Sequence, residues 1–284
     1  VAPCGDSLYF ARFSTAGALL YASYVPSSFR LETPELSAPP PSLTCFAATA
    51  GRISLGSLVP GQMITLTGAN FGPSQVVNSA LGPDGKFPTT LLGYSVNIGS
   101  FKAPIFAIAR GLLAVQVPFE VTDRTEISIS GPDAPPEILR AMVNTRNITL
   151  FDTGDADNPT RLPALSALNQ DSTVNSKSNP ATLGSIISVF GSGLVLPTAP
   201  RITGGFNPVD SIFTNTLISR GRNCTPVYIG SAPGLSNAVF QANLRLTTSD
   251  QSSGSVPPPI SFAVGDDPRS VLPPPPAAIV CVKD

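Results

Sequence analysis

The nine residues Pro60-Gly61-Gln62-Met63-Ile64-Thr65-Leu66-Thr67-Gly68 recur in altered form as Leu183-Gly184-Ser185-Ile186-Ile187-Ser188-Val189-Phe190-Gly191. The two copies lie about 123 residues apart, which is the period of a whole domain and not of a solenoid repeat. Ile64 and Leu66 alternate with Met63, Thr65 and Thr67, which is typical of a β-strand with one buried face. The sequence therefore predicts two copies of one β-domain.

Two further pairs of segments follow in the same order. Residues 96–100 (VNIGS) match residues 227–231 (VYIGS), and residues 114–117 (AVQV) match residues 240–244 (FQANL). The spacing between copies drifts by a few residues, as insertions in loops would cause. Each block again alternates between apolar and polar residues, so we expect each one to form a strand.

This pattern is typical of antiparallel sheets packed as a sandwich. The glycines of the repeat are expected to supply the positive φ that tight turns and bulges need; they are Gly68, Gly72, Gly191 and Gly193. The 31 Pro and 24 Gly residues are spread along the chain, as expected for turns between short strands. We predict an all-β protein with two tandem immunoglobulin-like β-sandwiches and an N-terminal β-hairpin extension.

Four segments are expected along the chain. Residues 1–45 would hold the hairpin and a Pro-rich segment, and residues 46–150 the first sandwich. Residues 151–165 are polar and rich in turn-forming residues, so they are predicted to be a linker before a second sandwich at 166–284.

The N-terminal stretch from residue 7 to 24 reads as two alternating strands around a turn at residues 14–17. A hairpin on its own is marginal in water, so it must lie on its own domains or on a neighbouring molecule. Its aromatic residues are the predicted assembly contacts: Tyr9, Phe10, Phe13, Tyr21 and Tyr24.

The composition excludes several classes of partner. The chain has 17 basic and 18 acidic residues, a net charge of -1, so no charge excess favours nucleic acid or an anionic membrane. No apolar run reaches the roughly 18 residues that a membrane span needs. The sequence begins at Val1 with no leader-like segment, and we expect any signal peptide or larger N-terminal part to lie outside it.

The four cysteines are Cys4, Cys45, Cys224 and Cys281. None forms a CxxC pair and the chain has no His, so disulfides are favoured over a zinc site. Pairing Cys4 with Cys45 and Cys224 with Cys281 needs the fewest contacts between domains, and free buried thiols are the alternative. Disulfides favour an extracellular location.

No catalytic residues are assigned. The absence of His excludes triads and relays that depend on it, and no local motif supplies another base for a Ser nucleophile. Asp152, Asp155 and Asp157 could bind Ca²⁺ through carboxylate oxygens, although a solvated linker is the simpler interpretation. No other cofactor is expected. Asn169, Asp171 and Asn175 are expected to cap a turn.

The segments 168–181 (LNQDSTVNSKSNPA) and 184–194 (GSIISVFGSGL), with Gln241 and Asn243, resemble the Ig-like C-terminal domain of large secreted acidobacterial (Solibacter-type) proteins. Residues 60–73 and the pair Ala103-Pro104 are similar to a more divergent copy. Residues 10–24 (FARFSTAGALLYASY) resemble a remnant of a bacterial β-propeller repeat. The resemblance implies an Ig-like fold and secretion, and it implies no catalytic residues.

We therefore expect a non-catalytic extracellular structural subunit. It would self-associate into a homo-oligomer or filament through strand or hairpin contacts with neighbouring copies. The alternative is a carbohydrate-binding or adhesive module of a larger secreted protein, with a polysaccharide as its partner and Tyr94 or Tyr228 as candidate contacts.

Overall fold

A computed structural model of the chain describes residues 9–13, 19–24, 41–49, 57–132, 134–144, 146–151, 166–176, 178–194, 202–207, 218–222, 224–247, 259–265, 278–279 and 282–283. The described residues form β-strands, turns and loops without a helix, so the prediction of an all-β chain is confirmed. In this part of the chain there is accordingly no helix of the length and apolarity that a membrane span needs.

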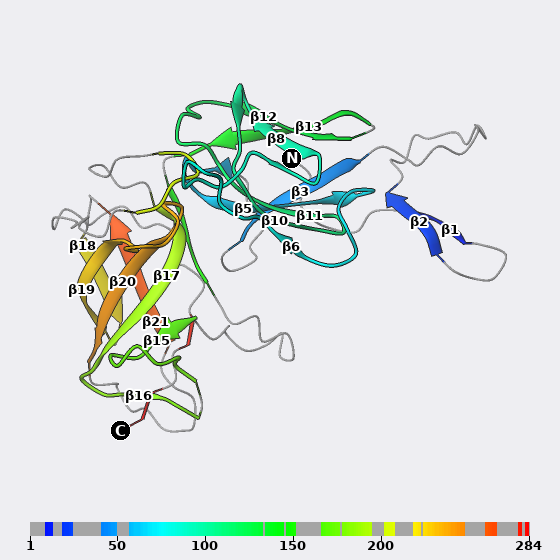
Figure 1. Cartoon of the computed structure of the whole chain (residues 1–284). Coiled ribbons are helices and arrows are strands. Elements are labelled where there is room, and N and C mark those ends of the chain that lie inside the picture. Colours follow the sequence, from blue (N-terminus) through cyan, green and yellow to red (C-terminus); the bar gives the residue numbers. More distant parts are fainter. Residues whose placement is uncertain are drawn as a thin grey trace. The chain divides into compact units, whose positions relative to one another are not determined.

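The chain divides into two compact units, Val1–Ala48 with Ser54–Thr145, and Thr49–Ile53 with Arg146–Asp284 (Figure 1). The predicted boundaries differ from this division in two places. Residues 146–150 form a strand of the second unit, and residues 42–45 belong to the first sheet of the first unit. The boundary at residue 45 followed the Pro-rich segment and the boundary at residue 150 followed the polar composition of 151–165, whereas strand pairing decides to which unit a segment belongs.

The first unit contains two sheets. The first sheet has the order β3-β5-β11-β10-β6, and all of its neighbouring strands are antiparallel. Its strands are β3 (Ser42–Ala48), β5 (Met63–Ala69), β6 (Val77–Asn78), β10 (Ile105–Ala109) and β11 (Leu112–Gln116).

The second sheet of this unit has the order β4-β13-β12-β8-β7, with β9 paired to β8. Its pairs are antiparallel except for the short parallel pair of β4 and β13. Its strands are β4 (Ser57–Leu58), β7 (Thr90–Leu91), β8 (Tyr94–Ile98), β9 (Phe101–Lys102), β12 (Thr125–Gly131) and β13 (Ala134–Val143).

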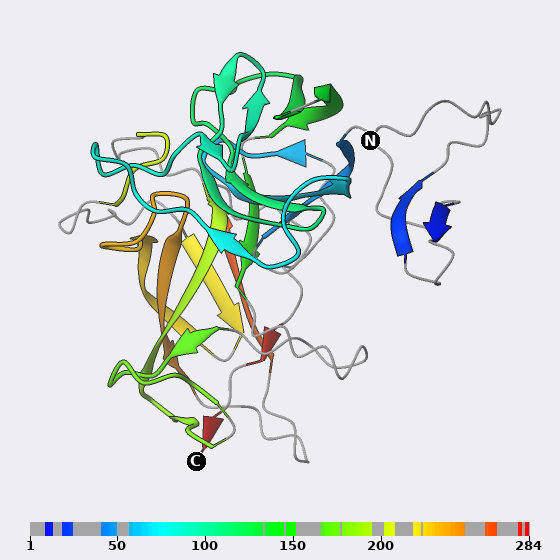
Figure 2. The same cartoon turned by 45° about the vertical axis from the view of Figure 1, so that its right-hand side comes forward.

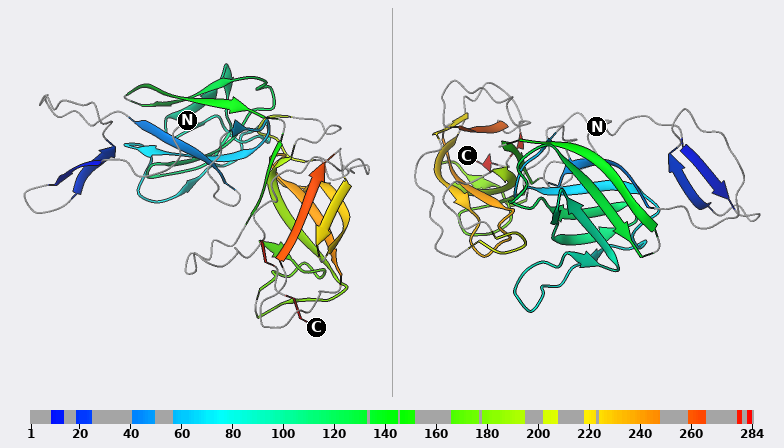
Figure 3. Two further views of the ribbon diagram at one scale, coloured as in Figure 1. Left: turned by 180° about the vertical axis from the view of Figure 1, so that it is seen from behind. Right: turned by 90° about the horizontal axis from the view of Figure 1, so that it is seen from above.

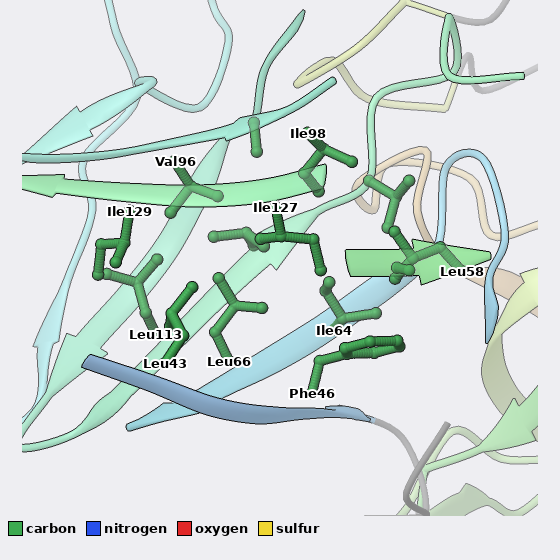
Figure 4. Close-up of a cluster of buried hydrophobic side chains, with 14 of the residues drawn as sticks. Leu43, Phe46, Leu58, Ile64, Leu66, Val96, Ile98, Leu113, Ile127 and Ile129 are labelled. Carbon is green, nitrogen blue, oxygen red and sulfur yellow. The ribbon is translucent and has the colours of Figure 1, made fainter. Parts of the chain in front are cut away.

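One apolar core lies between the two sheets. Ile64 and Leu66 from β5 face Ile127 and Ile129 from β12, and all four side chains are 0% exposed (Figure 4). Burying each such side chain stabilises the fold by about 1.5–3 kcal/mol. The alternation read from the sequence thus places the expected side chains inside.

Gln116 departs from that alternation. It was expected on the polar face of its strand, yet it is fully buried. The turn before β5 folds over the end of β11, because Val117 donates a backbone hydrogen bond to Gln62 (2.8 Å) and Gly61 donates one back to Val117 (2.8 Å). At this end of β11, burial therefore follows the backbone pairing with the turn and not the alternation of the strand.

The second unit has a four-stranded antiparallel sheet with the order β14-β17-β20-β19, and β15 pairs with β17 (Figure 3). Its strands are β14 (Arg146–Leu150), β15 (Ala167–Leu168), β17 (Ile186–Leu194), β19 (Cys224–Ser231) and β20 (Phe240–Leu246). Ile187, Val189, Phe240, Ala242 and Leu244 form the centre of its core.

The remaining strands of the second unit form two small sheets. One has the order β18-β21-β22, and the other pairs β16 with β23 in parallel. They are β16 (Ala181–Thr182), β18 (Ile218–Arg222), β21 (Pro259–Gly265), β22 (Ala278–Ile279) and β23 (Val282–Lys283). The side chains of β18, β21, β22 and β23 lie outside the described residues, so the second sandwich stays a prediction.

The internal repeat corresponds to a four-stranded arrangement that occurs once in each unit. The order β3-β5-β11-β10 of the first unit corresponds to β14-β17-β20-β19 of the second. The repeated blocks at 60–68 and 183–191 form β5 and β17, and those at 114–117 and 240–244 lie on β11 and β20. The match between residues 96–100 and 227–231 is wrong. Residues 96–98 lie on β8 in the opposite sheet, whereas residues 227–231 lie on β19, which takes the place of β10.

The glycines of the repeat serve two different purposes. Gly72 and Gly193 have positive φ (74° and 84°), as expected. Gly68 and Gly191 do not, and a Cβ atom there would lie 1.7 Å from the Ser42 carbonyl oxygen and 2.5 Å from the Thr149 carbonyl oxygen. These two positions need glycine because β3 and β14 approach closely, which corrects the expected role.

Candidate functional site

The predicted assembly contacts lie on a separate two-stranded sheet. β1 (Tyr9–Phe13) pairs antiparallel with β2 (Leu19–Tyr24), and among the described strands neither pairs with any other (Figure 2). The register places Tyr9 opposite Tyr24 and Arg12 opposite Tyr21. All five predicted aromatic residues are therefore on the two strands, and each strand keeps one edge with no described partner.

A second surface with unpaired backbone lies on β13. Its last two residues, Met142 and Val143, pair with β4. From Glu137 to Ala141, the described part of the chain supplies no strand partner on the side away from β12. Within the described part of the chain, this stretch of β13 is thus a sheet edge, and sheet edges accept added strands readily.

The edge of β13 is apolar on both faces. Ile138 and Met142 point outward and are 56% and 47% exposed, and Leu139 and Val143 are half-buried against the core. Between the outward pair lies Arg140, which makes an exposed ion pair with Glu126 on β12 (Nε to Oε1, 3.2 Å). A strand laid beside this edge would cover apolar surface on both faces.

Glu137 lies at the start of this edge and shares the inward-facing parity of Leu139. Partial burial raises the pKa of its carboxyl group above the usual value. No Lys or Arg among the described residues pairs with it. An inward-pointing charge and preceding prolines, here Pro135 and Pro136, are features that discourage indiscriminate pairing at a sheet edge.

Sequence reasoning missed this edge. The segment 137–143 (EILRAMV) alternates weakly, because both faces carry apolar residues. One signal was available: two consecutive prolines directly before a β-rich segment are tolerated at an edge and not in a central strand.

The cysteines have different states. Cys45 is disulfide-bonded and buried. Cys224 is a free thiol, which contradicts its predicted pairing with Cys281 and agrees with the alternative of a buried thiol. Its side chain packs in the core of the second unit, and burial raises its pKa to about 11. Cys4 and Cys281 lie outside the described residues.

The residues predicted to cap a turn, Asn169, Asp171 and Asn175, belong to a network of polar side chains. The Asn175 side chain donates to Asn169 Oδ1 (2.9 Å), and Asp171 Oδ1 accepts hydrogen bonds from the Thr173 backbone (3.1 Å) and hydroxyl (2.6 Å). The Asn179 amide donates to the Thr173 hydroxyl (2.7 Å). The hydrogen bonds from the Thr173 hydroxyl and backbone lower the pKa of Asp171. The expected side-chain to backbone capping is found for Asp171 and for Asn169, whose amide donates to the Asn179 carbonyl oxygen (3.0 Å). The hydrogen bond of Asn175 goes to the Asn169 side chain instead.

The predicted calcium ligands Asp152, Asp155 and Asp157 lie outside the described residues. Within the part of the chain that the structure describes, no group of three or more Cys, Asp or Glu side chains is placed to hold a metal ion. The calcium site therefore stays a prediction.

The two tyrosines considered for sugar binding are both half-buried. The Tyr94 ring packs against Phe71 with a centroid distance of 6.2 Å. The Tyr228 hydroxyl donates to the Ser231 carbonyl oxygen (2.7 Å). Each ring is thus engaged within its own unit and does not form an open aromatic platform.

Comparison with protein-family models, with curated proteins and with solved structures found no significant match.

Proposed function

We propose that the chain is a non-catalytic, extracellular structural subunit that self-associates through its N-terminal hairpin. The observation that carries this proposal is the isolated sheet of β1 and β2, which has five aromatic residues and no other described strand partner. A two-stranded sheet gains little stability alone and is completed by packing on another surface. Contacts of this head-to-tail kind produce filaments when they do not close into a ring.

Several features support an extracellular location. Only 12% of the residues are charged, below the quarter or so that is usual for globular domains. Disulfides such as that of Cys45 persist mainly in oxidising compartments. The equivalent order of four strands in a sheet of each unit supports the proposed relation to tandem Ig-like domains of secreted bacterial proteins.

The alternative function is a carbohydrate-binding or adhesive module of a larger secreted protein. The engagement of Tyr94 and Tyr228 within their own units gives this alternative less support. A glycan array would favour it if the chain bound one sugar and the Tyr94→Ala or Tyr228→Ala variant lost that binding.

Analytical ultracentrifugation of a hairpin variant tests the proposal. Tyr9→Ser combined with Tyr24→Ser removes a cross-strand aromatic pair and is expected to weaken self-association. Leu112→Ser removes a 45% exposed apolar side chain from β11 and serves as the matched control. Equal sedimentation of wild type and both variants as single chains would refute assembly through the hairpin.

A further inference from the structure

We propose that β1 of one copy adds as an antiparallel strand to the open edge of β13 in a second copy, with Arg12 opposite Glu137. This inference rests on the proposed function and names the acceptor surface for the hairpin. β1 is the donor because it is the hairpin strand that carries a charge; β2 has none.

The backbone of both partners meets the geometric requirement. β13 has five residues without a described partner on its outer side, Glu137 to Ala141, and the proposed register pairs four of them, Glu137 to Arg140, with Arg12 to Tyr9 of β1. β1 bonds β2 along one edge, and its other edge has no described partner. Main-chain hydrogen bonds along such a pair supply affinity, and side-chain matching supplies specificity.

The charges select the register. Glu137 is partly desolvated at the edge without a described cation beside it, which penalises a neutral or acidic incoming strand. Arg12 is the one charged residue of the hairpin strands. If Arg12 lies opposite Glu137, its guanidinium balances the negative charge of the Glu137 carboxylate, which otherwise discourages pairing at this position.

The neighbouring positions match in the same register. Stepping along an antiparallel pair from Arg12 and Glu137 puts Ala11 opposite Ile138, then Phe10 opposite Leu139. Phe10 thereby lies on the same face as Leu139, which is half-buried against the core. Ile138 becomes less exposed beside the added strand. A shift of one residue would move every side chain to the other face and separate the charges.

Disulfide trapping between differently labelled copies tests the pairing. One sample carries Ala11→Cys and the other Ile138→Cys, and mixing them under mild oxidation is expected to give a cross-linked dimer. The matched control is Ser128→Cys, which lies opposite Ile138 on β12, one strand farther from the edge. Cys224 is buried and does not compete.

A cross-link that forms equally well with Ser128→Cys would overturn the proposed register. A cross-link that forms only within single chains carrying both Ala11→Cys and Ile138→Cys would overturn the assignment to a second copy. In that case the hairpin closes on its own sandwich.

Charge reversal gives an independent test. Arg12→Glu is expected to weaken self-association by about tenfold or more through repulsion of Glu137. Adding Glu137→Arg to the same chain is expected to restore it, whereas Lys86→Glu, in a loop outside both strands, should leave it unchanged. If Glu137→Arg does not fold, the neutral pair Arg12→Gln with Glu137→Gln replaces it and is expected to assemble.

The outcomes separate the two proposals. If wild type associates but is insensitive to Arg12→Glu and gives no specific cross-link, the β13 edge is not the acceptor and the structural role stands. If wild type does not associate, the structural role fails, and the pairing between copies fails with it.

Discussion

At Gly68 and Gly191 the neighbouring strand occupies the space that a Cβ atom would need. Gly68→Ala is expected to destabilise the first unit by about 3 kcal/mol, because the obstructing atom is a backbone oxygen that cannot rotate away. Gly191→Ala should act in the same direction on the second unit. Urea unfolding measures both losses.

The control for these two variants is Gly85→Ala. Gly85 has a φ of 71° but no atom within 4 Å of an added Cβ, so only backbone strain of about 1 kcal/mol is expected. If Gly68→Ala is no more destabilising than this control, close approach of β3 is not the reason for the glycine.

The reactivity of the Cys224 thiol tests whether this side chain is buried in the core of the second unit. Burial raises its pKa to about 11, so the native chain should react with a thiol reagent at pH 8 far more slowly than the unfolded chain. The raised pKa also contributes stability that is fully present below the unfolded-state pKa and is lost as the pH rises from about 9 toward 11.

This loss should be smaller in Cys224→Ala, which has no thiol to ionise. The measurement is thermal unfolding of both proteins across that pH range. Rapid labelling of native Cys224, or an identical pH dependence of the two proteins, would contradict a buried thiol.

At the scale of the elements, Asn207 joins two loops of the second unit. Its buried side-chain amide donates to the carbonyl oxygens of Ala232 (3.0 Å), Ser236 (3.1 Å) and Val239 (2.9 Å). Asn207→Ala leaves these buried acceptors without that donor and is expected to cost about 1–3 kcal/mol.

The control for this variant is Asn97→Ala, on a half-buried position of β8, with an expected change of about 0.5 kcal/mol or less. Chemical unfolding distinguishes the two. Equal small effects would show that Asn207 does not hold the loops together.

The sequence predicted strands whose faces differ in polarity and missed those whose faces do not. β5 and β8 alternate cleanly, so their buried residues were identified in advance. The V-x-I-G-S match between β8 and β19 misled, because β8 ends before its glycine, whereas β19 continues through Gly230 and Ser231 and pairs there with β20. Which sheet a strand joins depends on long-range pairing, which a local pattern does not encode.

The candidate site shows the same division. The aromatic hairpin was visible in the sequence because its strands are short and flank a turn. The open edge of β13 was not, since an edge is defined by the absence of a neighbour along part of a strand. Likewise, Cys224 is buried in a core that includes residues far away in the chain, such as Ala167 and Ile187.

At the scale of the whole molecule, the aromatic hairpin and β13 each have a strand edge without a partner among the described residues, and head-to-tail pairing would satisfy both. Such an assembly grows with concentration by mass action, in contrast to a hairpin that closes on its own chain. Mass as a function of concentration therefore distinguishes a subunit from a self-contained module.

The most direct measurement is light scattering of the purified wild-type chain across a concentration series. We expect the weight-average mass to rise steadily above the 29.3 kDa of a single chain as the concentration increases. A mass that stays at 29.3 kDa throughout the series would contradict the self-associating subunit proposed for this protein.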